Sequence, residues 1–208
     1  MANRVPGSTH AIVLAAGSSE RIGRPKQLLE LGGETMLNRC LRQVSGVSFA
    51  GITLTLGAGA EQIIPTLPAQ KTFEVFLNPD YEKGLGNSIA SSVKYILKSV
   101  RPESVVLILA DQPFLTSEHL RTLLNAHEPG SEEMLLSDYG NGSCGPPVLI
   151  TQQFFKELCQ LDGDKGAKSV ISQHPEVCRK IDLIGFLPID IDTPENYQSF
   201  LEQLRKRV

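Results

Sequence analysis

The pattern of apolar and polar positions predicts strands and helices in close alternation along the chain. Short apolar runs bounded by glycine, proline or polar residues indicate buried strands. Apolar positions three and four residues apart indicate helices that bury one face. The predicted strands span residues 11–16, 52–57, 73–77, 104–111, 134–137, 147–150 and 186–191. The predicted helices span residues 34–47, 60–67, 87–100, 151–161, 167–174 and 194–206, with a further helix opened by Thr116.

The most apolar of these segments is the predicted strand Ser104–Asp111, which reads Ser-Val-Val-Leu-Ile-Leu-Ala-Asp. A strand that is apolar on both of its faces is typical of the centre of a parallel sheet covered by helices on each side. Alternating strands and helices therefore predict an α/β sandwich with a mostly parallel sheet. The chain has 208 residues and shows no internal repeat or linker, so we expect residues 1–208 to form a single domain.

Charge and cysteine content narrow the class of partner. The formal net charge is −3, which favours neither a nucleic acid nor a membrane surface as a partner. The four cysteines form no C-x-x-C pair and have no histidine at zinc-ligand spacing, which is typical of free thiols in a reducing compartment. The first apolar run, Ala11–Ala16, is too short to span a bilayer, and we expect a cytoplasmic protein.

Three glycine-containing segments need to be separated from nucleotide motifs that they resemble only in part. Gly140–Gly145 matches G-x-G-x-x-G, but two prolines and an apolar run follow, where a dinucleotide fingerprint requires a helix. Gly57-Ala-Gly59 has glutamine at the third glycine position and indicates a tight turn from strand to helix. Gly17–Lys26 lacks the spacing of a phosphate-binding P-loop. Simple dehydrogenase and kinase functions are therefore disfavoured.

Parallel sheets bind ligands at the carboxyl ends of their strands, and three such ends carry unusual residues: 17–26, 111–113 and 190–194. In the first segment, Ser18 and Ser19 supply hydroxyl donors, Arg21 suits bidentate phosphate binding and Lys26 adds a point charge. A solvated loop with ordinary basic residues fits the composition of this segment equally well. Asp111 is either a metal-binding carboxylate or a turn residue, since Mg²⁺ prefers one or two carboxylates together with phosphates and waters.

Two further segments are candidates for binding substrate. Gly84–Ser88 precedes a helix whose N–H groups and Ser88 hydroxyl suit an anion or a nucleotide, although a capped helix start explains them too. We also expect nucleotide binding to involve Asn78, which closes a predicted strand, and Gly86. Gly163–Gly166 is either a loop that closes over the acceptor or a simple turn between helices.

The segment Leu14–Leu29 resembles the signature L-A-A-G-x-S-x-R-(I/M)-G-x-x-K-x-L-L of nucleotidyltransferases with a glycosyltransferase-A-like Rossmann domain. Further segments that carry a resemblance are Gly23–Lys26, Gly84–Ser88, Ala110–Pro113, Gly145–Leu149, Gly163–Ala167 and Asp190–Pro194. They are similar to the molybdenum cofactor cytidylyltransferase branch, and the resemblance covers about residues 9–200. Ile22 departs conservatively from the commoner methionine, and Gln112 replaces the methionine of guanylyl-transferring relatives.

The resemblance implies a three-layer Rossmann-like sandwich and transfer of CMP from CTP to the terminal phosphate of molybdopterin, with release of pyrophosphate. It implies catalytic roles for Lys26, Arg21 and Asp111, and Mg²⁺ bound by Asp111 and Asp192, with Asp190 as a less certain neighbour. It also implies an acceptor-side loop at Asp138-Tyr139 and Gly145–Val148, and a recipient molybdoenzyme or its chaperone as partner. The expected nucleotide-binding residues are Leu14, Ala15, Ala16, Gly17, Ser18, Arg21, Lys26, Asn78, Gly86, Ser88 and Asp111.

Two alternatives remain open at this point. The same chemistry is compatible with GTP as the nucleotide, or with a sugar phosphate or alcohol phosphate as the acceptor. A chaperone that binds the molybdenum cofactor without catalysis is the alternative from a different class, and the presence of both Lys26 and Asp111 counts against it.

Overall fold

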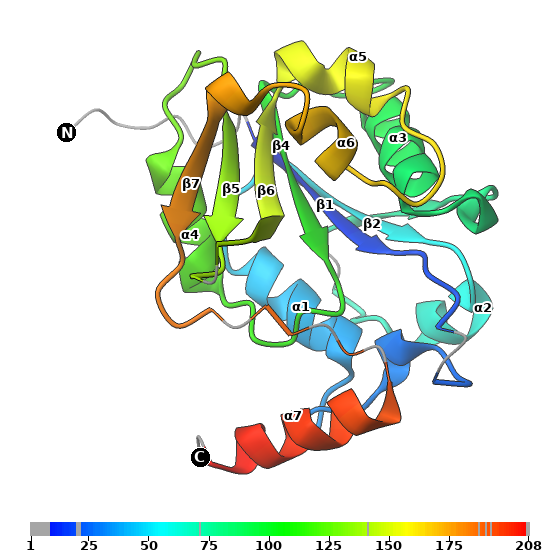
Figure 1. Cartoon of the computed structure of the whole chain (residues 1–208). Coiled ribbons are helices and arrows are strands. Elements are labelled where there is room, and N and C mark those ends of the chain that lie inside the picture. Colours follow the sequence, from blue (N-terminus) through cyan, green and yellow to red (C-terminus); the bar gives the residue numbers. More distant parts are fainter. Residues whose placement is uncertain are drawn as a thin grey trace.

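A computed structural model describes residues 9–19, 22–70, 72–140, 142–186, 188–189, 191 and 193–206. Within these residues a seven-stranded sheet has the order β3-β2-β1-β4-β6-β5-β7 (Figure 1). The strands are β1 Thr9–Ala15, β2 Gly51–Leu56, β3 Glu74–Leu77, β4 Ser104–Leu109, β5 Met134–Asp138, β6 Cys144–Thr151 and β7 Cys178–Asp182.

Most neighbouring strands run parallel, as the sequence predicted. β1 pairs in parallel with both β2 and β4, β2 with β3, and β5 with β7. β6 runs antiparallel to β4 and β5 and so breaks the pattern on one side of the sheet. The β1–β4 register pairs Leu14 with Leu109, and the N–H of Ala110 donates to the carbonyl of Leu14 at 3.1 Å. The chain therefore leaves these two central strands at the same level.

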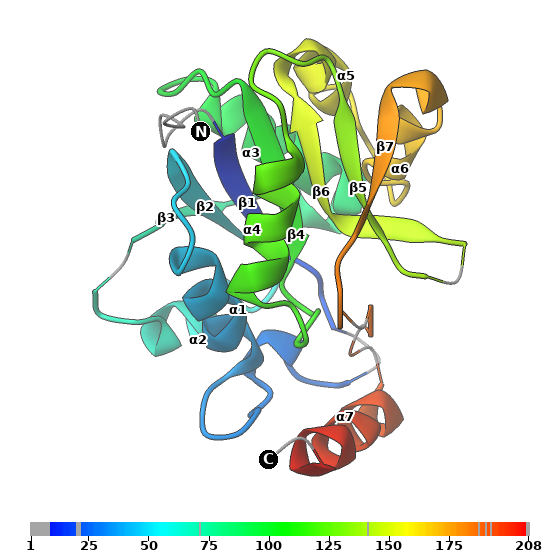
Figure 2. The ribbon, with the colours of Figure 1, turned by 90° about the vertical axis from the view of Figure 1, so that its left-hand side faces the viewer.

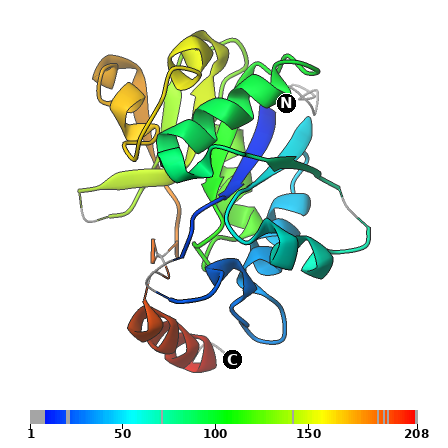
Figure 3. The same ribbon diagram turned by 90° about the vertical axis from the view of Figure 1, so that its right-hand side faces the viewer.

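Helices cover both faces of the sheet, which confirms the α/β sandwich. α1 (Met36–Ser45) and α4 (Ser117–Ala126) lie on one face (Figure 2), and α3 (Leu85–Ile96) lies on the other (Figure 3). The side chains of β1 alternate between the two resulting cores, since Ala11 and Val13 join the α1 side while Ile12 and Leu14 join the α3 side. The shorter helices are α2 Ala60–Ile63, α5 Phe155–Leu158 and α6 Lys168–Ile171, and the C-terminal helix is α7 Pro194–Lys206.

Short 3₁₀ turns lie next to several helices and strands, and the apolar pattern did not predict them. They are η1 Lys26–Leu28, η2 Ile64–Thr66, η3 Tyr81–Lys83, η4 Gln152–Phe154 and η5 Pro175–Val177. The predicted helix 60–67 is thus divided into α2 and η2, and Pro65 lies within η2. Proline lacks the N–H that continuation of an α-helix needs. The helix predicted at Thr116 is confirmed: the Thr116 side chain accepts from the N–H of His119, which completes a capping box in place of glutamate.

The prediction of a last strand over residues 186–191 is wrong for the residues that the structure describes there. Phe186 packs in the core on the α1 side and Ile191 joins a third cluster, and neither lies in a strand. The last strand is instead β7, whose sequence Cys-Arg-Lys-Ile-Asp is mostly polar. Among the described strands β7 pairs with β5 alone, at the edge of the sheet, where side chains remain exposed, so an apolar pattern was not required there.

The third apolar cluster fixes α7 beyond the edge of the sheet where β1 and β4 end (Figure 1). Its buried residues are Leu29, Leu31, Met36, Phe114, Ile191 and Phe200. Phe200 of α7 packs on Phe114 with ring centroids 4.9 Å apart, and the Tyr197 hydroxyl donates to the carbonyl of Glu30 at 2.7 Å. α7 thereby supports the segment between β1 and α1. No helix in the described ranges is long and apolar enough to cross a membrane, and all four cysteines have free thiols.

Candidate functional site

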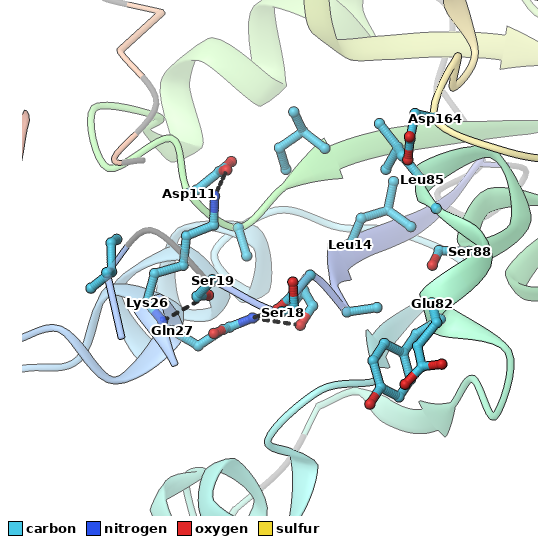
Figure 4. A pocket seen from close by; sticks show the side chains of 18 of the residues that line it. Leu14, Ser18, Ser19, Lys26, Gln27, Glu82, Leu85, Ser88, Asp111 and Asp164 are labelled. Carbon is cyan, nitrogen blue, oxygen red and sulfur yellow. Dashed lines mark hydrogen bonds and ion pairs between the residues drawn. The ribbon is translucent and has the colours of Figure 1, made fainter. Parts of the chain in front are cut away.

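A cavity of about 860 Å³ opens where β1 and β4 end (Figure 4). Its walls come from the loop that follows β1, the turn η1, the end of β4, and the start of α3. Asp164, from the turn between α5 and α6, also lines it. This placement agrees with the general rule that ligands bind at the carboxyl ends of parallel strands.

Lys26 and Asp111 form an ion pair on one side of the cavity (Figure 4). The Lys26 ammonium donates to Oδ2 of Asp111, and the two side chains are only 16% and 17% exposed. η1 presents the lysine directly after Pro25, while the aspartate follows the apolar strand β4. Two residues that sequence analysis assigned to catalysis are therefore in direct contact.

The other oxygen of Asp111 lacks a comparable partner. Asp111 Oδ1 is buried and accepts no hydrogen bond from the described residues. Burying a carboxylate oxygen without a donor or a cation is destabilising, and a carboxylate with one free oxygen is the kind of ligand that Mg²⁺ accepts. The described residues contain no group of three or more histidine, cysteine, aspartate or glutamate side chains that could bind a metal. Asp190, Asp192 and Arg21 lie outside the described residues.

Cys40 of α1 lies behind this carboxylate. Burial and, to a smaller extent, the negative charge of Asp111 together raise the pKa of the Cys40 thiol to about 12. A thiol with this pKa is neutral near pH 7, and only the thiolate is an effective nucleophile. Cys40 therefore contributes packing and no nucleophilic chemistry.

The loop after β1 is held by hydrogen bonds to η1. The Gln27 carboxamide donates to the carbonyl of Ala15 at 2.8 Å and to that of Gly17 at 3.4 Å. The backbone N–H of Lys26 donates to the Ser19 hydroxyl at 3.1 Å. The cavity is lined by five residues that the sequence resemblance assigned to nucleotide binding: Leu14, Ala15, Ala16, Gly17 and Ser18. Gln27, to which the sequence pattern assigned no role, lines the cavity with them.

The start of α3 forms the opposite wall, and only part of the predicted set reaches the cavity there. Ser88 lines the cavity, whereas Asn78 and Gly86 stand behind the lining. The Asn78 carboxamide donates to the Ser88 hydroxyl at 3.2 Å and positions it. Gly86 donates its N–H to the carbonyl of Gly163 at 2.7 Å, so this N–H is already used within the protein.

Gly86 is needed for close packing at this wall. A Cβ atom there would approach the carbonyl oxygens of Asp162 and Gly163 to 2.8 and 2.9 Å, closer than real contacts allow. The turn that carries Asp164 can therefore lie directly on the start of α3. Asp164 and Glu82 line this side of the cavity, so the cavity has two carboxylates on the α3 side and the Lys26–Asp111 ion pair on the other (Figure 4).

The glycine segments that sequence analysis set aside have the expected structures. Gly59 has φ 68° and precedes α2, which makes Gly57–Gly59 a tight turn. Gly140–Gly145 leads into strand β6 and opens no helix in its described part. The predicted acceptor-side residues Asp138 and Tyr139 lie at and just after the end of β5, away from the cavity lining.

Comparison with known proteins agrees with this geometry. The model of the MobA-like NTP transferase domain matches residues 11–177. The purine catabolism protein PucB of Bacillus subtilis is 33% identical over 89% of this chain and 92% of its own length. The molybdenum cofactor cytidylyltransferase of Escherichia coli is 25% identical over 89% and 92%.

Among solved structures, Rv0371c of Mycobacterium tuberculosis superposes with a TM-score of 0.81 at 31% identity, covering 95% of this chain and 99% of its own. A complex of Rv0371c with manganese superposes at 0.76 and 29% identity, covering 95% and 100%. The family match, the parallel sheet and the cavity after β1 lead to one assignment. This chain belongs to the family of MobA-like NTP transferase domains.

Proposed function

We propose that this chain is a Mg²⁺-dependent nucleotidyltransferase that moves CMP from CTP to the terminal phosphate of the molybdenum cofactor and releases pyrophosphate. The observation that carries the proposal is the Lys26–Asp111 ion pair in the cavity after β1. The likeness to the molybdenum cofactor cytidylyltransferase and the presence of Gln112 next to Asp111 support CTP as nucleotide and the cofactor as acceptor.

The charge distribution of the cavity orients the substrates. Lys26, together with Arg21, would bind the triphosphate, because phosphate oxygens suit cationic donors. The carboxylates of Glu82 and Asp164 on the α3 side would repel phosphate and instead accept hydrogen bonds from amino or hydroxyl groups of a nucleoside. We therefore place the triphosphate on the side of Lys26 and the nucleoside toward α3 and Ser88.

Transfer requires an in-line attack by an oxygen of the acceptor phosphate on the α-phosphorus of CTP. The bond from the α-phosphorus to the bridging oxygen breaks, and pyrophosphate takes the electron pair. A phosphate dianion is already a nucleophile without a proton to remove, and no histidine is found among the described residues that line the cavity. Positioning and neutralisation of charge then supply the rate enhancement.

Asp111, with Asp192, would hold the divalent metal. Oδ1 of Asp111, which is buried and accepts no hydrogen bond within the described part of the chain, fits this role. Mg²⁺ bound there would neutralise negative charge on the transferred phosphate and on the leaving pyrophosphate. The manganese complex of a structurally similar relative supports a divalent metal in this fold.

A substrate panel tests the proposal. Pyrophosphate release is measured with CTP, GTP, ATP and UTP, each with the molybdenum cofactor, a sugar phosphate or an alcohol phosphate as acceptor. We expect release with CTP and the molybdenum cofactor, and loss of release on chelation of the metal. Preference for GTP, or for another phosphate acceptor, would replace the specificity and leave nucleotidyl transfer in place. Tight cofactor binding without turnover on any nucleotide would instead favour the non-catalytic chaperone.

A further inference from the structure

We propose that Gln27 is a positioning residue that fixes the nucleotide-binding loop Ala15–Gly17 and keeps its carbonyl groups away from the triphosphate. This inference rests on the proposed function, because it assigns a role within the same cavity. Gln27 is only 2% exposed, yet it lines the cavity together with Lys26.

The contacts of Gln27 are directed at the loop backbone. Its Nε2 donates to the carbonyl of Ala15 at 2.8 Å and, more weakly, to that of Gly17 at 3.4 Å (Figure 4). A single carboxamide therefore binds two carbonyls of the loop that follows β1. The backbone N–H of Lys26 makes a third link, to the Ser19 hydroxyl. The loop and the turn that presents Lys26 are consequently held in one fixed arrangement.

These hydrogen bonds have an electrostatic consequence for an anionic ligand. A carbonyl oxygen that faces a phosphate repels it, and an amide N–H bound to that oxygen offsets its partial charge. Because Gln27 binds the carbonyls of Ala15 and Gly17, the loop offers the ligand fewer free acceptors. A neutral amide suits this task better than a second cation would, since it leaves the charge balance of Lys26 and Asp111 unchanged.

The other end of the carboxamide points to a ligand rather than to stability alone. Gln27 Oε1 is buried and has no hydrogen-bond partner among the described residues. An amide placed only to stabilise the core would be expected to have both its polar atoms paired, because a buried unpaired acceptor is destabilising. A hydrogen-bond donor of the bound substrate, or an ordered water, would satisfy this oxygen.

The test compares three variants of nearly constant side-chain volume. Gln27→Met removes the donor, and Gln27→Glu replaces it with a carboxylate. Gln43→Met is the matched control, because the Gln43 side-chain oxygen accepts part-buried hydrogen bonds from the N–H and hydroxyl of Ser117, at 2.9 and 3.0 Å, between α1 and α4 outside the cavity. Calorimetry gives the Kd of CTP, thermal unfolding gives stability, and pyrophosphate release gives kcat and the KM of each substrate.

We expect Gln27→Met to weaken CTP binding about tenfold, as loss of one structured hydrogen-bonding group allows. The KM of the acceptor should stay within about twofold of the wild-type value, and Gln43→Met should lower stability without changing the Kd of CTP. Gln27→Glu should bind CTP more weakly still at pH 8 and recover relative to wild type as the pH falls, because a protonated carboxyl donates again to Ala15.

The outcomes separate the two proposals. Wild-type protein that binds none of CTP, GTP, ATP and UTP would overturn the proposed function, and the role of Gln27 with it. Wild-type binding of CTP together with an unchanged Kd in folded Gln27→Met would overturn the positioning role alone. If Gln27→Met does not fold, the pH dependence of Gln27→Glu decides: affinity that follows the wild-type pH profile would overturn the inference.

Discussion

Lys26 donates a hydrogen bond to Asp111, a residue 85 positions away in the sequence. The contact exists because β1 and β4 are neighbours in parallel register, so that the segments following them leave the sheet together. In the free protein the two charges satisfy each other. A bound metal–triphosphate complex would give Asp111 a cation and Lys26 a phosphate, so we infer that substrate replaces this ion pair by two separate interactions.

Removing the carboxylate should stop catalysis and leave the fold intact. We expect Asp111→Ala and Asp111→Asn to lose pyrophosphate release by about a hundredfold or more, the usual effect of deleting a charge that stabilises a transition state. Because Asp111→Asn also frees Lys26 from its ion pair, metal-free CTP should bind this variant at least as tightly as it binds the wild type. Circular dichroism checks folding, and wild-type pyrophosphate release by Asp111→Ala would rule out the catalytic assignment.

Removing the Lys26 cation should weaken nucleotide binding and leave metal binding intact. Lys26→Met is expected to weaken CTP binding about tenfold or more, as loss of a charged hydrogen bond implies. Binding of Mn²⁺ alone should not weaken, since Asp111 loses its competing partner. Lys83→Met is the matched control: Lys83 pairs with Asp80 on the surface, with both side chains more than half exposed. Equal loss of CTP affinity in the two variants would contradict a specific role for Lys26.

Gly17 tests whether the cavity space belongs to the nucleotide. A Cβ atom on Gly17 would meet no atom of the described residues within 4 Å, so Gly17→Ala should leave thermal stability unchanged. CTP binding should nevertheless weaken, because the added methyl group would occupy space in the cavity that Gly17 lines. Gly57→Ala is the contrasting variant, since its Cβ would lie 2.4 Å from Tyr81 Cβ and should lower stability. Unchanged CTP affinity in Gly17→Ala would remove this loop from the binding site.

His119 should make stability depend on pH. Its Nδ1 accepts from the N–H of Thr116 and its Nε2 donates to the carbonyl of Ile184, which requires the neutral ring. Burial lowers the pKa of His119, outweighing the opposite effects of the Ile184 carbonyl and Glu118. In the unfolded chain this histidine has a pKa of ~6.5, so below that pH the unfolded chain binds more protons than the folded protein does. This contribution to stability is complete above about pH 6.5 and is lost as the pH falls toward the lower folded-state pKa.

Urea denaturation between pH 5 and 8 measures this dependence. We expect the free energy of unfolding of the wild type to decrease as the pH is lowered. The decrease should be less steep in His119→Gln, which keeps the capping box with a side chain that does not titrate. His10 also has a pKa lowered by burial, so some slope should remain in the variant. Identical slopes in the two proteins would show that His119 is not the group responsible.

The local sequence determined the central strands and the character of the loop after β1. The apolar runs of β1 and β4 identified the central strands, because a strand buried on both faces has no polar positions. The small residues after β1 and the cation Lys26 marked the segment that lines the cavity, since backbone and charge requirements are local. For the same reason the glycine segments at 57–59 and 140–145 have the predicted local structures, a turn before α2 and an entry into strand β6 in the described part.

Tertiary structure alone decided the features that depend on contacts between distant residues. β7 was overlooked because an edge strand is held by backbone hydrogen bonds to β5, which leave no apolar pattern. Phe186–Ile191 was taken for a strand because its apolar residues pack in two separate clusters, which composition cannot distinguish from pairing. The ion pair of Lys26 with Asp111 follows from strand order and register. The proposed role of Gln27 follows from the backbone carbonyls that lie within reach of its carboxamide. Sequence supplies the chemical groups, but the sheet determines which of them meet, because register sets distances that no local pattern encodes.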